Sequence, residues 1–203
     1  MIPPDITHTA KMVGLSGIHE IIHEPMYFHR LIPVMDPGPI RVEFFDQSYG
    51  AATRGLVDTN LHIAGMLPGN HAFIVCGLAV LVNHSERRRW HHLAESGVME
   101  FNIADRMMGT FRCSMLPLFQ PGHTRTVTEE WTSRRITKIV KKVQITEGML
   151  RLDPTIVIQP LRPFRVTMTF ISPRPRLPWP MLIPTDPLGV TMILSGYRVR
   201  PVL

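Results

Sequence analysis

Cysteine and long apolar segments are both scarce in this 203-residue chain. The two cysteines, Cys76 and Cys113, are too few for a disulfide scaffold, and both lie in apolar stretches that predict buried free thiols. A disulfide between them stays open. The longest apolar run, residues 72–82, is far shorter than the roughly 20 residues of a membrane-spanning helix. No basic stretch followed by an apolar one opens the chain, so we expect no signal peptide and synthesis in a cytoplasm.

Charged residues are also few. They make up 19% of the chain against 44% hydrophobic residues, a balance that excludes extensive disorder and allows a real core. The formal net charge of +6 suits contact with nucleic acid, anionic lipid or an acidic partner, and suits a plain basic surface equally well. The 19 prolines and 14 glycines divide the chain into short segments, which favours strands over long helices.

Short strand-like segments separated by turn signals follow one another along most of the chain. Residues 72–82 are predicted to be the most buried strand, because they are apolar without interruption. The other predicted strands are 41–45, 98–104, 110–119, 125–132, 135–146, 154–161, 164–171 and 190–203. This spacing predicts an all-β fold, an antiparallel β-sandwich or a barrel. The polar stretch 83–97 predicts a long loop or a short helix.

One short motif suggests a metal site. Residues 19–23 spell HEIIH, which matches the H-E-x-x-H pattern of zinc peptidases, and His29 stands where one peptidase clan has its third ligand. That chemistry requires His19 and His23 on one face of a helix. Glycines before the motif and Pro25 after it leave room for about two helical turns at most. We therefore predict no metal here, with zinc binding by these three histidines as the alternative.

A second cluster combines charge with an aromatic ring. Arg87, Arg88 and Arg89 could hold phosphate or carboxylate groups, and Trp90 could stack on a base. A solvated loop or a subunit contact is the simpler interpretation, and we favour it.

Sequence motifs for catalysis are missing. The chain has no nucleophile elbow, phosphate-binding loop or dinucleotide fingerprint, no His-x-His of the cupin type, and no obvious acid–base pair. We therefore predict no enzymatic activity, no catalytic residue and no cofactor.

Three segments carry a resemblance to a known group of proteins. The leading MIPPDITHTAKMVG, the apolar AFIVCGLAVLV and the final VTMILSGYRVRPVL together resemble the single jelly-roll capsid and structural proteins of viruses and phages. The resemblance implies a jelly-roll β-sandwich over residues 35–203, with a proline-rich loop at 172–187, preceded by an extended N-terminal arm or assembly segment over residues 1–34. It implies self-assembly in a virion shell after synthesis in a host cytoplasm. The implied partners are copies of itself, other virion proteins and packaged nucleic acid, without a membrane span.

The arm and the proline-rich loop are the expected contact segments, because proline and adaptable methionine pack well on neighbours. Trp179 lies between two prolines and is a candidate interface anchor, although it could equally pack on its own domain. The predicted subunit-interface residues are Pro3, Pro4, Met26, Tyr27, Phe28, Pro178, Trp179 and Pro180.

Two functions of other classes stay open. One is a monomeric β-sandwich module that binds nucleic acid or glycan through residues 83–97. The other is a zinc peptidase that uses the HEIIH motif.

Overall fold

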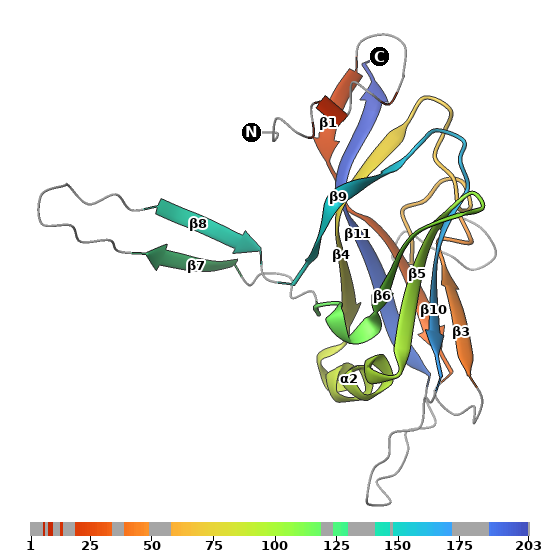
Figure 1. The fold of residues 1–203 in the computed structure, drawn as a ribbon, viewed down its shortest axis with the longest axis vertical. Helices are drawn as coiled ribbons and strands as arrows, with labels where there is room; N and C mark the ends of the chain where they lie inside the picture. Colours follow the sequence, from red (N-terminus) through yellow and green to blue (C-terminus); the bar gives the residue numbers. More distant parts are fainter. Residues whose placement is uncertain are drawn as a thin grey trace, which may run out of the picture.

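The computed structural model describes residues 6, 8–9, 13, 19–33, 39–48, 58–118, 124–129, 141–146, 148–171 and 187–202. Within these residues, eleven named strands form three sheets in which every pairing between strands is antiparallel. Two of the sheets face each other as a sandwich (Figure 1). The expected all-β, antiparallel sandwich-like architecture is therefore confirmed. No helix in the described part of the chain is long and apolar enough to cross a membrane.

The first sheet is built around its last strand. Its members are β1 (His19–His23), β2 (Met26–Ile32), β4 (Ala72–Val82), β9 (Leu150–Ile158) and β11 (Leu188–Pro201). On one side, β11 pairs with β2 along its first half and with β1 along its second half. On its other side it pairs with β4, which in turn pairs with β9.

The second sheet has the order β3-β10-β5-β6. Its members are β3 (Ile40–Phe44), β5 (Gly97–Ile103), β6 (Arg106–Arg112) and β10 (Phe164–Phe170). Burial alternates cleanly in β3, whereas β6 is exposed along most of its length. β6 is therefore an edge strand that contributes few side chains to the hydrophobic core.

Shorter elements lie between the strands of the two large sheets. The turn η1 (His84–Glu86) and helix α2 (Arg87–Glu95) lie between β4 and β5 and cover one end of the sandwich (Figure 1). The turn η2 (Cys113–Met115) follows β6. Strands β7 (Thr124–Glu129) and β8 (Lys141–Thr146) pair with each other as a separate two-stranded sheet.

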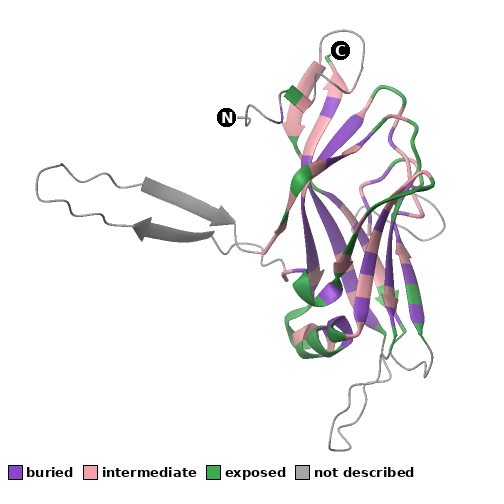
Figure 2. Ribbon diagram, viewed as in Figure 1, coloured by how far each residue is buried: buried purple, intermediate pink, exposed green. Residues whose placement is uncertain are grey.

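The core lies between the two large sheets, where most of the buried residues are found (Figure 2). The Phe28 ring contacts those of Phe44 and Phe45, with ring centroids 6.4 and 5.7 Å apart. Phe45 continues this contact to Phe164 at 5.6 Å. The aromatic rings thus join β2 of the first sheet to β3 and β10 of the second.

Part of the predicted arm belongs to the sandwich itself. Residues 19–32 form β1 and β2 and pair with β11, so the expected boundary at residue 34 does not separate an arm from the sheet. Met26, Phe28 and Ile32 alternate along β2 and are buried in the core, which explains why this segment joins the sheet. Most of residues 1–18 and residues 172–186 of the proline-rich segment lie outside the described residues.

Some strands lie at the positions predicted from the sequence and others do not. β4 and the segments around β3, β5, β10 and β11 lie where apolar patterns predicted them. The prediction of a strand over residues 110–119 is wrong, because β6 ends at Arg112 and a 3-10 turn follows.

Candidate functional site

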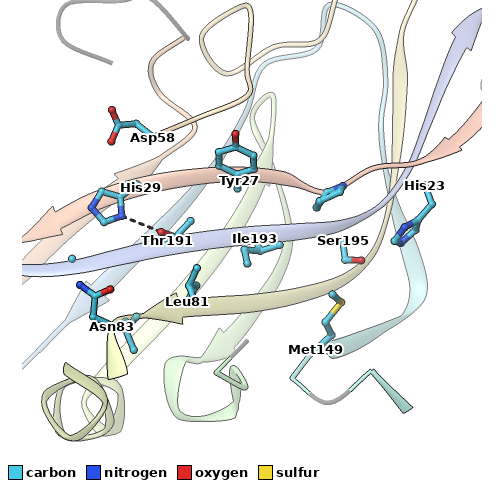
Figure 3. A pocket seen from close by; sticks show the side chains of 13 residues that line it. His23, Tyr27, His29, Asp58, Leu81, Asn83, Met149, Thr191, Ile193 and Ser195 are labelled. Atoms are coloured by element: carbon cyan, nitrogen blue, oxygen red, sulfur yellow. Dashed lines mark hydrogen bonds between the residues drawn. The ribbon is translucent and has the colours of Figure 1, made fainter. Parts of the chain in front are cut away.

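A groove crosses the outer face of the first sheet. It has a volume of about 720 Å³ and lies over β2, β11 and β4 (Figure 3). Its apolar floor includes Leu81 of β4, Ile193 of β11 and Met149 just before β9. Ligand pockets in proteins commonly have about this volume and an apolar lining with a few polar groups. This groove is therefore the strongest candidate for a binding site in the described part of the chain.

Polar side chains gather toward the ends of the groove. His29, Asp58, Asn83 and Thr191 line one end, and His23 with Ser195 lies toward the other (Figure 3). Adjacent outward-facing positions of β2 and β11 supply several of these groups, because alternate residues of a strand share one face. The groove can therefore offer hydrogen bonds at its ends and apolar contact between them.

His29 and Thr191 form the one hydrogen bond drawn among the groove residues, with His29 Nδ1 3.0 Å from Thr191 Oγ1 (Figure 3). An imidazole beside a hydroxyl can activate a nucleophile in some enzymes. Here the two residues are direct partners in the register of β2 and β11. Cross-strand neighbours meet in this way without any catalytic purpose. We therefore assign the pair to the sheet and name no nucleophile.

Gly189 provides the space for the His29 ring. A Cβ atom at Gly189 would lie 3.1 Å from His29 Cε1, closer than ordinary van der Waals contact. The backbone amide of His29 also donates to the Asp58 carbonyl oxygen at 2.7 Å, which joins the loop before β4 to β2. These contacts fix the polar end of the groove.

The HEIIH motif forms a strand. His19 and His23 lie at the two ends of β1 rather than one helical turn apart, so the geometry of the peptidase motif is absent. His23 contacts the Tyr197 ring edge-on, with centroids 5.2 Å apart. His23 and His29 both line the groove, but no group of three or more metal-ligating side chains occurs among the described residues.

The cluster around Trp90 is divided by helix α2. Trp90 is 1% exposed and packs against Phe170 with ring centroids 6.4 Å apart, so its indole is not available for the alternative of stacking on a base. Helical periodicity turns this position toward the core. Arg89 bonds Glu86 at 2.6 Å, Arg87 is half-buried, and Arg88 alone of the three arginines is exposed.

The predicted interface residues also divide. Met26 and Phe28 are fully buried in the core, so their assignment to a subunit surface is wrong for this structure. Tyr27, between them, faces outward and lines the groove. The remaining predicted interface residues lie outside the described residues: Pro3, Pro4, Pro178, Trp179 and Pro180.

Most groove residues were not predicted from the sequence. The available signal was the uninterrupted apolar run of β4, since an antiparallel strand with one wet face normally alternates. Successive residues of β4 lie alternately in the core and on the outer face of the first sheet. Leu81 is on the outer face and lines the groove. Asp58 and Asn83 lie outside any named strand and carried no such signal.

The chain was compared with family models, curated proteins and solved structures. No family model, no curated protein and no solved structure matches the chain.

Proposed function

We propose that this chain is a structural, self-assembling protein of the single jelly-roll type, a subunit of a virus or phage shell. The order of its strands is the observation that carries the proposal. The first sheet has the order β1/β2-β11-β4-β9 and the second has the order β3-β10-β5-β6. The separate hairpin of β7 and β8 lies in the chain between β6 and β9.

This order follows from folding one long hairpin around a core. Eight strands remain when β1 and β2 are counted together as the first strand and the separate sheet of β7 and β8 is left out. The first strand then pairs with the eighth, the second with the seventh, and the fourth with the fifth. The third, β4, pairs with the sixth, β9. Wrapping such a hairpin places the eighth strand beside the third and the seventh beside the fourth, as in the pairs β11–β4 and β10–β5. Two interlocked Greek keys of this kind characterise jelly rolls, which are frequent in viral capsids.

Exposed apolar side chains support association with neighbouring subunits. Large hydrophobic residues with half or more of their surface exposed occur on several elements, among them Leu31, Met107, Met115, Leu161 and Ile171. Single exposed residues are ordinary, but several of them together with an apolar groove suit a protein whose surfaces become covered on assembly.

A monomeric β-sandwich binding module is the second candidate function. The groove favours it, because its volume of about 720 Å³ suits a bound ligand. Jelly rolls also occur in lectins, so a glycan is the ligand class that this fold would favour. We do not retain the zinc peptidase, because its motif lies in a strand.

Light scattering of the purified chain over a range of concentrations, with negative-stain images of the same samples, tests the proposal. We expect regular particles, tubes or closed oligomers. Met107→Glu on the exposed edge strand should reduce their mass, whereas Ser114→Glu, also exposed but polar to begin with, should not. A monomer at every concentration would refute self-assembly, and binding of glycan or salt-sensitive binding of nucleic acid by that monomer would favour the second candidate.

A further inference from the structure

A second hollow lies at the end of the sandwich away from α2. Two turns that lie side by side form its rim, one between β5 and β6 and the other directly after β9 (Figure 1). We call it the turn pocket, and its lining comes from residues 103–108 and 157–162. It has a volume of about 490 Å³ and shares no lining residue with the groove on the first sheet. The turn pocket is therefore a separate site.

Both turns hold a residue in a backbone conformation that favours glycine. In the two-residue turn between β5 and β6, Ala104 has a φ of 51°. In the turn of residues 159–162, whose ends are joined by a backbone hydrogen bond of 3.3 Å, Leu161 has a φ of 55°. The Ala104 amide donates to the Pro163 carbonyl oxygen at 2.6 Å, which joins the two turns. Conformations of this kind are unfavourable for a residue with a Cβ atom, and they gather at sites where the fold holds a ligand.

Each of the two turns ends in an arginine. Arg106 and Arg162 both line the turn pocket. Neither guanidinium group has an ion-pair or hydrogen-bond partner in the part of the chain that the structure describes, whereas Arg165 lies 3.9 Å from Glu43 Oε1. The planar fork of a guanidinium group matches the oxygens of a carboxylate or a phosphate. Two unpaired forks at one cavity therefore provide the donors of an oxyanion site.

The other lining residues indicate what the oxyanion is attached to. Ile103, Met108 and Val157 supply apolar surface, and Gln159 supplies an amide. The volume of about 490 Å³ far exceeds the roughly 30 Å³ that one water occupies in the liquid, so a bare phosphate ion would leave most of the turn pocket empty. Asp105 is the one acidic residue among the described residues of the lining, so two cationic groups face one carboxylate.

We propose that the turn pocket binds a small molecule that carries a phosphate or carboxylate group on an apolar body. Arg106 and Arg162 hold the oxyanion, and the apolar side chains of the lining contact the body. The carboxylate of Asp105 repels the oxyanion. The site does not depend on the proposed shell function, because every group in it belongs to one chain.

Equilibrium dialysis of the purified full chain tests the site, and it works whether or not the chain assembles. Phenyl phosphate is the first probe, because it joins the oxyanion to an apolar ring, and benzoate is the second. We expect at least one of them to bind saturably, and the tighter of the two identifies the oxyanion. Inorganic phosphate should bind several-fold more weakly than phenyl phosphate, because it has no apolar body.

Four variants locate the bound probe. Arg106→Gln and Arg162→Gln should each weaken its binding about tenfold, because each removes charged hydrogen bonds. Arg112→Gln removes the same charge from an exposed position at the far end of β6 and should leave the affinity unchanged. Asp105→Asn should tighten binding several-fold, because it removes the opposing charge.

Equal losses of affinity in Arg162→Gln and Arg112→Gln would refute the site, because they would show only a general attraction of anions to a basic protein. Failure of both phenyl phosphate and benzoate to saturate would also overturn it, and equally tight inorganic phosphate would contradict the apolar body. If circular dichroism shows that Arg162→Gln does not fold, Arg162→Lys replaces it. Lysine keeps the charge and loses the fork, so binding should still weaken several-fold.

Discussion

Replacement of Gly196 by alanine should separate the two central strands of the first sheet. A Cβ atom at Gly196 would lie 2.0 Å from the carbonyl oxygen of Ile74 and 2.9 Å from the Phe73 ring. Real Cβ contacts stay above about 3.0 Å, so β4 and β11 would have to move apart by about 1 Å. Ladder hydrogen bonds of about 2.9 Å would then stretch to about 3.9 Å, beyond hydrogen-bond range. The oxygen belongs to the backbone and cannot rotate away.

The expected loss of stability is large. Overpacking of a core costs about 1–3 kcal/mol, and each lost ladder bond adds about 1 kcal/mol, so Gly196→Ala should lower the free energy of unfolding by about 3–5 kcal/mol. Gly189→Ala in the same strand is the matched control. Its Cβ would meet His29 Cε1 at 3.1 Å, and that side chain can shift, so we expect a change of less than about 1 kcal/mol. Urea denaturation followed by far-UV circular dichroism measures both. Equal losses in the two variants would refute the reasoning.

Two further predictions concern buried side chains. Trp90→Ala should lower the free energy of unfolding by about 3–5 kcal/mol, because the indole is fully enclosed, while Arg88→Ala on the outer face of α2 should change it by less than about 0.5 kcal/mol. Thermal unfolding measures both, and similar melting temperatures would contradict the placement of Trp90. Burial raises the pKa of Cys113 to about 12, so a thiol reagent at neutral pH should label Cys76 in the folded protein and both cysteines in denaturant. Mass spectrometry counts the labels, and equal native labelling rates would contradict this burial.

Local pattern was sufficient for the strands that the core buries. The uninterrupted run of β4 and the alternation of β10 express burial directly, and both strands occur where the pattern predicts them. β6 was misplaced because it is exposed along most of its length, so it had no burial pattern to show. The sandwich was therefore predictable, while an edge strand with little buried surface was not.

The candidate site depended on relations that no local pattern contains. The residues HEIIH match a motif that is helical in zinc peptidases. Here they form a strand, because they pair with β11, whose residues lie far away in sequence. The groove likewise arises from β2, β4 and β11 lying side by side. Trp90 is an exception, because the spacing of the buried residues Trp90, Leu93 and Ala94 on α2 is a local helical pattern.

The central place of β11 has a consequence for how the chain is made. A ribosome synthesises residues 188–201 after all the other described strands, yet β1, β2 and β4 each pair with them. During translation the apolar β4 therefore waits with one edge unpaired, and the two N-terminal strands wait without their partner. Long-range pairing of this kind folds slowly and exposes nascent chains to aggregation. Chaperone demand should thus peak late in synthesis and end when β11 leaves the exit tunnel.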